Sequence, residues 1–422
     1  MSSTVPRRRA LVATVAGAAL ATSVAVALPA SAAPGARGPA ADRGPTTLRV
    51  ATFNASLNRS VEGGLVADLS TPDDPQAQAV SEVIQRNAPD LLLVNEFDHD
   101  ADGRALDLFR ENYLEVGQNG AGPVEYPYAF SAPVNTGVPS GYDLDNDGSV
   151  GGPNDAYGFG FFPGQYGMAV FSKYPIDEDA VRTFQRLLWK DMPGALLPDD
   201  PATGTPGGWY SQEELEHVRL SSKSHWDVPV DVDGRTVHFL VSHPTPPVFD
   251  GPEDRNGRRN HDEIRLWADY VSPGKRSAWI TDDAGARGGL TPGASFVVAG
   301  DQNSDPRDGD SLPGSIQQLL DAPRVNTSVT PSSDGAVEAS LAQRGANLEH
   351  ESPARYDTAD FSEPPGNIRA DYVLPSTDLR IVDAGVFWRT SDDPLSRLTT
   401  GTFPSDHRLV HVDVRVPGTG RR

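Results

Sequence analysis

The 422-residue chain contains no cysteine, and acidic residues far outnumber basic ones. Without cysteine, disulfide bonds, zinc sites with thiolate ligands and iron–sulfur clusters are excluded, so packing and bound ions must hold the fold together. The chain carries 58 Asp and Glu against 36 Lys and Arg, a formal charge of −22. The electrostatic field of so negative a protein repels polyanions unless bound cations bridge the two, which counts against a nucleic-acid binder. Beyond the N-terminus, no apolar run approaches the roughly 20 residues of a membrane span.

Residues 1–33 have the pattern of a secretory signal peptide. Three arginines at 7–9 precede the apolar stretch 11–28, and the sequence ASA at 30–32 is an A-x-A type cleavage site. The arginines also fit a twin-arginine signal, so export in the folded or in the unfolded state stays open. Loss of this segment removes three positive charges and no negative ones, which leaves the mature chain at −25. We expect a secreted, extracellular protein whose residues 34–46, rich in Pro, Gly and Ala, form a disordered linker.

Residues 47–418 are predicted to form one α/β domain. Continuous apolar runs that end on polar residues are typical of strands buried on both faces, and they occur at 48–53, 91–94, 168–171, 237–241 and 296–299. Asp74 followed by Pro75 predicts the start of a helix. Asn260 with Glu263 resembles a capping box at the start of a second helix, and the apolar pattern over 312–320 indicates a third.

Two further predicted strands, 372–374 and 409–416, have their polar residues in front of them. If these strands run antiparallel to the others, all the polar residues reach the same edge of mixed sheets. This edge would collect Asn54, Glu96, His243, Asp301, Asn303, Asp371, Asp406 and His407. The loops 117–165 and 191–210 are too long to be mere connections, and we expect them to form substrate walls.

The residue types at this edge suit phosphoester chemistry. Oxygen atoms of Glu96, Asp406 and Asn54 are the ligands that Mg²⁺, Mn²⁺ or Ca²⁺ prefers. Two histidines beside carboxylates suit proton transfer near neutral pH. Hydrolysis of a phosphoester needs both a cation to spread the charge on the oxygens and a base for water.

Seven motifs resemble, in wording and order, those of the endonuclease/exonuclease/phosphatase superfamily, which has the deoxyribonuclease I-like fold. They are LRVATFN at 48–54, DLLLVNEF at 90–97, YGMAVFSKYPI at 166–176, HFLVSHPTPP at 238–247, VVAGDQNSDP at 297–306, IRADYVLPS at 368–376 and SDHRLVHVDV at 405–414. The resemblance implies a four-layer αββα sandwich of two mixed β-sheets flanked by helices. It also implies a metal-dependent phosphoric ester hydrolase and makes Glu96 the main metal ligand, with Asn54 and Asp406 completing or bordering the ion site.

The resemblance implies roles for five further residues. His407 would act as general base toward the attacking water or contact the scissile phosphate, and Asp371 would orient it. Asp301 would position or activate the water, and Asn303 would donate a hydrogen bond to a phosphoryl oxygen. His243 is implied to be a proton donor to the leaving group.

The segment 250–261 departs from the familiar members of that superfamily because it carries three arginines, Arg255, Arg258 and Arg259. They either clamp a substrate phosphate or another anion, or form a solvated basic loop on an acidic protein. Both interpretations stay open.

A second departure is the segment DLDNDG at 143–148, which copies the start of a calcium-binding loop with Asp143, Asp145 and Asp147 at alternate positions. The twelfth residue is Asn154 rather than Glu, and Asp155 follows it. Three interpretations stay open: a structural Ca²⁺ site with these four aspartates, an acidic turn without an ion and, least favoured, a site for a second catalytic ion.

The sequence thus predicts a secreted phosphoesterase that uses Mg²⁺ or Mn²⁺ for water attack on phosphorus. We expect a phosphomonoester or phosphodiester of a small organic phosphate or phospholipid type. The negative charge, the long loops and the lack of a basic run interleaved with aromatics favour this over nucleic acid. We expect a monomer without a stable nucleic-acid partner. The alternatives are an extracellular nuclease and, less favoured, an exported binding protein without catalysis.

Overall fold

The computed structural model describes residues 44–418. The predicted signal peptide and nearly all of the predicted linker lie outside the described residues. The first strand, β1, begins at Thr46 and pairs there with Val416. Within residues 44–418, the helices are too short or too polar to cross a membrane.

The first sheet has the strand order β12-β13-β1-β2-β4-β3. Its strands, in chain order, are β1 (Thr46–Asn54), β2 (Leu91–Asn95), β3 (Tyr128–Phe130), β4 (Met168–Ser172), β12 (Arg380–Val386) and β13 (Val410–Val416). The pair β1 and β2 is parallel, and the other pairs are antiparallel. The sheet is therefore mixed, as predicted.

The second sheet has the order β11-β8-β7-β6-β5. Its strands are β5 (Arg182–Thr183), β6 (His225–Val232), β7 (Arg235–Ser242), β8 (Ser295–Asp301) and β11 (Asp371–Pro375). Only β7 and β8 are parallel here, so this sheet is mixed as well. A separate short pair joins β9 (Ala359–Asp360) to β10 (Asn367–Ile368).

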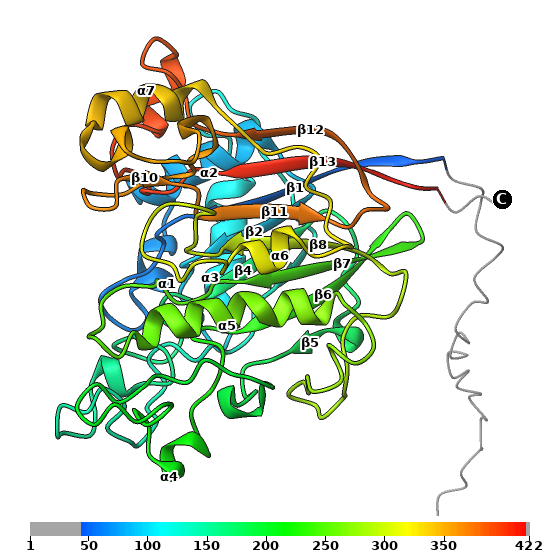
Figure 1. The fold of residues 1–422 in the computed structure, drawn as a ribbon. Helices are drawn as coiled ribbons and strands as arrows, with labels where there is room; N and C mark the ends of the chain where they lie inside the picture. The colour runs from blue at the N-terminus through cyan, green and yellow to red at the C-terminus, as the bar shows by residue number, and fades with distance from the viewer. Residues whose placement is uncertain (1–43, 419–422) are drawn as a thin grey trace, which may run out of the picture. The chain divides into compact units, whose positions relative to one another are not determined.

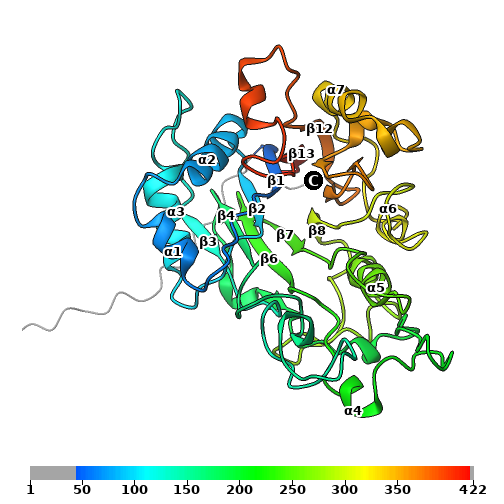
Figure 2. The ribbon, with the colours of Figure 1, turned by 90° about the vertical axis from the view of Figure 1, so that its left-hand side faces the viewer.

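Helices cover the outer face of each sheet, and Figures 1 and 2 show the strands lying between them. Helices α1 (Gly64–Leu69), α2 (Pro75–Asn87) and α3 (Arg104–Phe109) pack on the first sheet, and α5 (Arg255–Tyr270) and α6 (Gln317–Leu320) pack on the second. The remaining α-helices are α4 (Gln212–Leu215) and α7 (Asp334–Gln343). Short 3₁₀ turns lie at Pro153–Asp155, Glu178–Ala180, Trp189–Asp191, Gly345–Leu348, Ala354–Tyr356 and Pro394–Leu398, and a π-helical turn lies at Arg110–Leu114.

The buried strands supply apolar side chains to two layers at once, because successive side chains of a strand point to opposite faces. In β8, Val297 and Ala299 face the core between the sheets, whereas Phe296 and Val298 face the helices α5 and α6. This explains the continuous apolar runs of the sequence. The predicted four-layer αββα sandwich is confirmed.

The helix predictions had mixed outcomes. Helix α2 begins as predicted, and the Asp74 side chain accepts a hydrogen bond from the backbone N–H of Ala77. The prediction that a helix starts at Asn260 was wrong, because α5 begins five residues earlier and both Asn260 and Glu263 lie buried within it. Only Gln317–Leu320 of the third predicted helix is α-helical.

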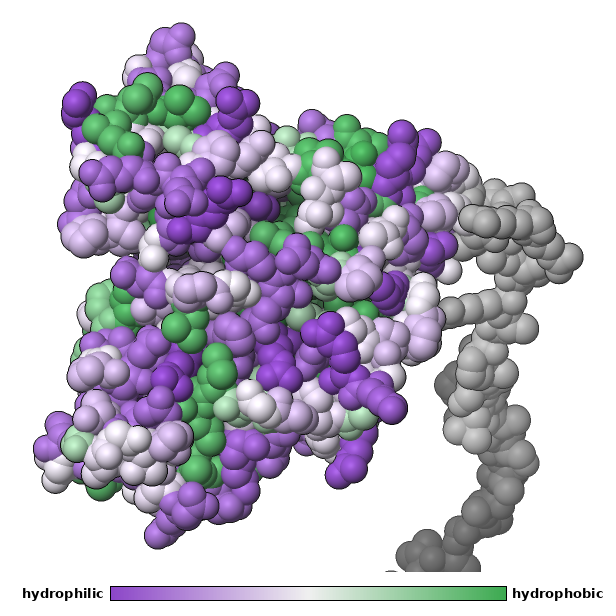
Figure 3. Space-filling view, in the orientation of Figure 1, coloured by the Kyte–Doolittle hydropathy of each residue, from purple (hydrophilic) through white to green (hydrophobic). Residues whose placement is uncertain are grey.

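Most of the polar strand ends meet at one edge of the sandwich, as the sequence predicted. The strand 168–171 is the exception: β4 runs antiparallel to β2, so Ser172 lies beside Leu91 at the opposite edge. Asn54 at the end of β1 lies beside Asn95 at the end of the parallel strand β2. Asp301 at the end of β8 is the register partner of Asp371 at the start of the antiparallel strand β11. On the face shown in Figure 3, hydrophilic residues predominate and hydrophobic ones gather in separate patches, one of them over α7.

Candidate active site

The Asp301 carboxylate lies at the centre of the polar edge and is almost completely buried. Its Oδ2 accepts a hydrogen bond from Asn54 Nδ2 at 3.1 Å and lies 3.3 Å from His243 Nε2. The Nε2 atom of His407 is 3.6 Å from the same oxygen. The other oxygen, Oδ1, accepts a hydrogen bond from the backbone N–H of Asn303 at 2.9 Å. Four of the predicted residues therefore converge on this one carboxylate.

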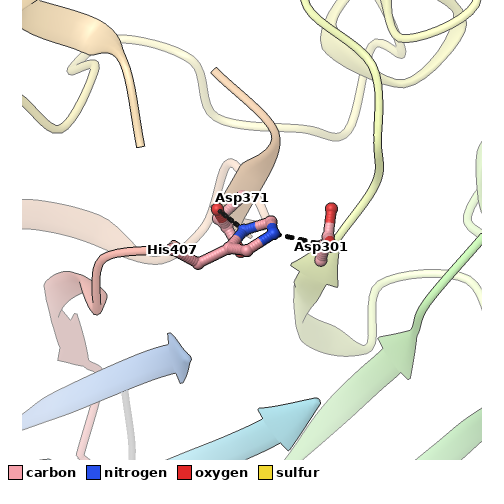
Figure 4. Close-up of side chains that lie close together, drawn as sticks. All are labelled: Asp301, Asp371 and His407. Atoms are coloured by element: carbon pink, nitrogen blue, oxygen red, sulfur yellow. Dashed lines mark hydrogen bonds and ion pairs between the residues drawn. The ribbon is translucent and has the colours of Figure 1, made fainter. Parts of the chain in front are cut away.

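His407 lies between two carboxylates, as Figure 4 shows. Its Nδ1 is 2.8 Å from Asp371 Oδ2, which also accepts a hydrogen bond from the Thr358 hydroxyl at 2.7 Å. Burial by itself would lower the pKa of His407, but the charges of Asp371 and Asp301 outweigh it and raise this pKa to about 10. The ring is therefore a cation at neutral pH.

The pKa values of Asp301 and His243 are shifted as well. Burial would raise the pKa of the Asp301 carboxyl, but the charge of His407 and the hydrogen bonds from His243 and Asn54 hold it below its usual range. Burial, followed by the charge of Lys223, lowers the pKa of His243. His243 Nε2 lies 3.3 Å from the Asp301 carboxylate, and its role as proton donor to the leaving group stays a prediction.

Glu96 follows β2 in the left-handed backbone region, with φ of 58°. Such a conformation is unusual for a residue with a side chain and occurs preferentially at functional sites. Glu96 Oε1 accepts a hydrogen bond from Asn54 Nδ2 at 3.2 Å, and Oε2 accepts one from Asn58 Nδ2 at 2.8 Å. The oxygen of Asn54 accepts the N–H of Ser56 instead. Asn54 therefore bridges the carboxylates of Glu96 and Asp301 through its nitrogen, and its role as an ion ligand stays a prediction.

The acidic residues around the cavity fit a hard divalent cation. Glu96 and Asp406 line the same cavity, and the Asp406 side chain makes no hydrogen bond with any other described residue. Carboxylate oxygens of this kind suit Mg²⁺ or Mn²⁺. The oxygens and nitrogens of Asp301, Asp371 and His407 also lie within 4.8 Å of one another. Because His407 is cationic and already hydrogen-bonded, we interpret that trio as a proton-sharing network and not as the ion site.

A cavity of about 990 Å³ opens onto these residues. The predicted wall loop 117–165 contributes Thr136, Leu144, Asn154, Ala156, Tyr157 and Phe159, whereas the loop 191–210 contributes only Tyr210 to this lining. Phe249, which is 86% exposed, and Phe159 stand at the cavity as exposed aromatic side chains. The cavity thus has a polar, charged floor and a partly apolar rim.

The three arginines of 250–261 do not form a common clamp. Arg258 forms an ion pair with Asp199 at 2.8 Å and does not line the cavity. Arg255 lines the cavity, but it donates to the carbonyl of Leu144 and lies 3.6 Å from Glu253. Arg259 donates to backbone carbonyl oxygens, namely those of Leu220, Tyr157, Arg219 and Ser221. The geometry favours a bracing role for these side chains.

The acidic loop brings together part of the predicted calcium ligands. The carboxylates of Asp143, Asp145 and Asp147 lie within 4.8 Å of one another. Asp155 is buried, and its two oxygens accept the backbone N–H groups of Leu144 at 2.7 Å and Gly151 at 2.8 Å. Asp155 therefore closes the turn through backbone hydrogen bonds.

The sequence analysis missed the function of two buried polar residues of α5. Asn260 Nδ2 donates to the carbonyls of Thr245 and Gln302, at 2.9 Å each. The oxygens of Glu263 accept the backbone N–H groups of Ser222 at 2.6 Å and Thr245 at 2.7 Å. These two side chains fix the loops that follow β7 and β8. Two polar residues three positions apart on the apolar face of a helix could have indicated this role.

Asn95 was missed in the same way. Its Oδ1 accepts the backbone N–H of Asp301 at 3.3 Å, and its Nδ2 donates to the carbonyl of Ser242 at 3.4 Å. Asn95 belongs to the first sheet, and both partners belong to the second. It therefore fixes the relative position of the two sheets at the site.

The model of the Endonuclease/Exonuclease/phosphatase family matches residues 51–407. A search of curated proteins gave no match.

Similar solved structures include an endonuclease/exonuclease/phosphatase from Beutenbergia cavernae, with 18% identity over 89% of this chain and 72% of that one and a TM-score of 0.47. Sphingomyelinase C from Streptomyces griseocarneus has 15% identity over 87% and 99% of the two chains, with a TM-score of 0.42. A beta toxin variant from Staphylococcus aureus with bound magnesium ions has 14% identity over 87% and 99%, with a TM-score of 0.41.

Proposed function

Because the chain belongs to the Endonuclease/Exonuclease/phosphatase family, a family of metal-dependent phosphoric ester hydrolases, we propose that it hydrolyses a phosphoester by attack of water on phosphorus. The observation that carries this proposal is the convergence of Asn54, His243 and His407 on the buried carboxylate of Asp301. This network lies in the same cavity as Glu96 and Asp406. The site therefore combines a place for a cation with groups that orient water and stabilise charge.

Glu96 and Asp406 would hold Mg²⁺ or Mn²⁺, and the bound ion would neutralise charge on the phosphoryl oxygens. A carboxylate with a lowered pKa orients water well but retains a proton poorly, so Asp301 would position the attacking water. His407, kept cationic by Asp371, would contact an oxygen of the scissile phosphate. The Asn303 side chain already donates one hydrogen bond to the carbonyl of Pro244 and would direct its second N–H to another phosphoryl oxygen.

For the substrate, we propose a small organic phosphate or a phospholipid-type phosphoester. The support is the exposed aromatic rim of Phe159 and Phe249 above a charged floor, together with the net charge of −22. A strongly acidic protein attracts a long polyanion poorly. Extracellular nuclease activity is the alternative.

We also propose that the protein is exported. The support is the arginine-led apolar segment and the ASA site within residues 1–33. Fractionation of a culture of the producing cell, followed by N-terminal sequencing of the extracellular protein, tests this. Export predicts a mature N-terminus close to residue 33, whereas an uncleaved protein confined to the cell would contradict it.

The activity is tested with a panel of phosphoesters. Duplex DNA, RNA, sphingomyelin, glycerophosphodiesters, inositol phosphates and an aryl phosphate are each incubated with Mg²⁺, Mn²⁺ or Ca²⁺, with and without chelator. The proposal expects turnover that the chelator abolishes. Rapid cleavage of DNA alone would replace the proposed substrate class with the nuclease alternative.

Two histidine variants make this test specific. His407→Ala removes the ring between Asp371 and Asp301, and turnover should fall by roughly 10²- to 10⁴-fold. His217→Ala is the matched control, because His217 is exposed and stacks on Tyr142 away from the catalytic network. If no phosphoester in the panel gives turnover that depends on both the ion and His407, the enzymatic function is refuted.

A further inference from the structure

Four basic side chains other than histidine line the cavity within residues 44–418, and three of them are already engaged. Arg219 donates to Asn135 Oδ1 at 2.6 Å and lies over the ring of Tyr157. Arg255 and Arg259 donate to the backbone carbonyls described above. The fourth is Lys223, whose ammonium group forms no hydrogen bond or ion pair with any described residue.

Lys223 is also deeply buried, with 7% of its surface exposed. Its ammonium nitrogen is not among the fully buried unpaired atoms of the described residues, so it opens to the cavity and is not sealed in the core. Burial lowers the pKa of Lys223, and the charges of Glu263, Glu96 and Asp301 oppose this shift. A bound anion would favour the charged form further. A ligand in the cavity would therefore reach the ammonium group and complete its coordination.

The backbone around Lys223 is fixed on both sides. Its carbonyl accepts the N–H of Asn135 at 2.9 Å. The preceding residue, Ser222, is bound through its N–H and its hydroxyl to Glu263, which also binds the loop carrying His243. Residue His225, two positions later, pairs with Ser242 at the end of β7. The lysine therefore enters the cavity from a rigid segment next to the catalytic loop.

We propose that Lys223 contacts a non-bridging oxygen of the substrate phosphate and that it is the one side chain committed to this phosphate apart from the catalytic network. This inference rests on the proposed function and deepens it. Since the other basic side chains that line the cavity within residues 44–418 already donate to protein groups, we expect no second phosphate subsite there. The substrate class is accordingly an ester with a single phosphate whose remaining part is uncharged or cationic, not a polyphosphate.

The lysine is tested by Lys223→Met, which keeps the length of the side chain and removes the charge. Loss of a charged hydrogen bond to the phosphate should lower kcat/KM by about 10- to 100-fold. The thermal midpoint should stay equal or rise, because an unpaired buried charge has been replaced by an apolar group. Lys223→Arg should recover part of the activity. Lys275→Met, at an exposed position, is the control for the loss of one lysine.

A merely structural lysine would give the opposite pattern. Lys223→Met would then lower the thermal midpoint, and activity would fall only as far as the folded fraction does. Binding of inorganic phosphate, measured by calorimetry in the presence of Mg²⁺, distinguishes this proposal from the proposed function. Wild type should bind phosphate at least about 10-fold more tightly than Lys223→Met, even if none of the tested esters is a substrate. Equal phosphate affinity in the two proteins would overturn the inference and leave the hydrolase function standing.

The single-phosphate class is tested with two esters that share one leaving group. Thymidine 5′-(p-nitrophenyl phosphate) carries one phosphate, and the same compound with an added 3′-phosphate carries two. Wild type should cleave the first at least as fast as the second, because the cavity has no free basic side chain for the added group and an acidic surface around it. A 10-fold or greater preference for the compound with two phosphates would overturn this part.

Discussion

Replacement of Asp371 by asparagine should lower the pKa of His407 while leaving the shape of the site intact. Asp371 Oδ2 lies 2.8 Å from His407 Nδ1, and the two side chains are buried together. A hydrogen bond to a charged group contributes about 1.5 to 3 kcal/mol, and one pKa unit corresponds to about 1.4 kcal/mol. We therefore expect Asp371→Asn to lower the pKa of His407, which is about 10 in the wild type, by roughly 1 to 2 units.

The change also alters how stability depends on pH. The folded-state pKa of His407 is raised, so its contribution to stability is fully present below the unfolded value near pH 6.5. This contribution is lost as the pH rises through about 10. Asp371→Asn lowers the folded-state pKa of His407 and with it the upper limit of the pH range over which stability falls. The variant should therefore lose less stability than wild type between pH 7 and pH 10. Its kcat/KM should fall by about 10- to 100-fold, because the neutral amide orients the ring and stabilises its charge less well than the Asp371 carboxylate does.

Titration of the His407 ring by NMR measures the pKa directly, and urea unfolding at pH 7 and pH 10 measures the stability. Asp360→Asn is the matched control, because Asp360 is paired with Arg408 at 3.1 Å rather than with a histidine. The control should leave the pKa of His407 close to the wild-type value. A His407 pKa in Asp371→Asn that equals or exceeds that of wild type would refute the reasoning that the Asp371 charge keeps the ring cationic.

Three further predictions concern the framework. Burial lowers the pKa of His225 to about 3, so its contribution to stability is present above about pH 6.5 and is lost as the pH falls, by at most about 1.4 kcal/mol per unit. In urea unfolding, His225→Gln should lose less free energy of unfolding between pH 7 and pH 5 than wild type does. An equal loss in the two proteins would contradict the attribution to His225. Asp74→Ala removes the N-cap of α2 and should cost about 1 kcal/mol, seen as a lower urea midpoint than for the exposed control Asp73→Ala. Arg259→Met leaves several carbonyls without a donor and should cost about 3 kcal/mol, whereas Arg258→Met should cost under about 1 kcal/mol; equal thermal midpoints for the two variants would show that Arg259 does not brace the loops.

Local patterns of the sequence predicted mixed sheets covered by helices, and the resemblance to the superfamily implied the four-layer order. Strands buried on both faces must be continuously apolar, and β8 shows this with Val297 and Val298 facing opposite cores. The position of polar residues after β1, β2, β7 and β8 but before β11 and β13 predicted one shared edge. The pairing of Asp371 with Asp301 confirms that edge.

Local patterns were ambiguous for polar residues whose hydrogen-bond partners lie far away in the chain. Asn260 and Glu263 have the spacing of a capping box, and that spacing also places two side chains on one buried face of a helix. The second arrangement holds because Thr245 and Gln302 approach α5 from other loops. The sequence cannot show which backbone groups will need a partner there.

The sequence by itself determined the fold class and the residues that gather at the edge, because apolar periodicity and strand polarity are properties of consecutive residues. Only the tertiary structure decided what those residues do to one another. In the folded protein, the nitrogen of Asn54 points toward Glu96. Arg259 donates hydrogen bonds to carbonyls some 40 to 100 positions away in the chain. Lys223 lines the cavity, and its ammonium group has no hydrogen-bond partner among the described residues. Charge and hydrogen-bond balance depend on distances in space, and these are set by packing between segments remote in the sequence.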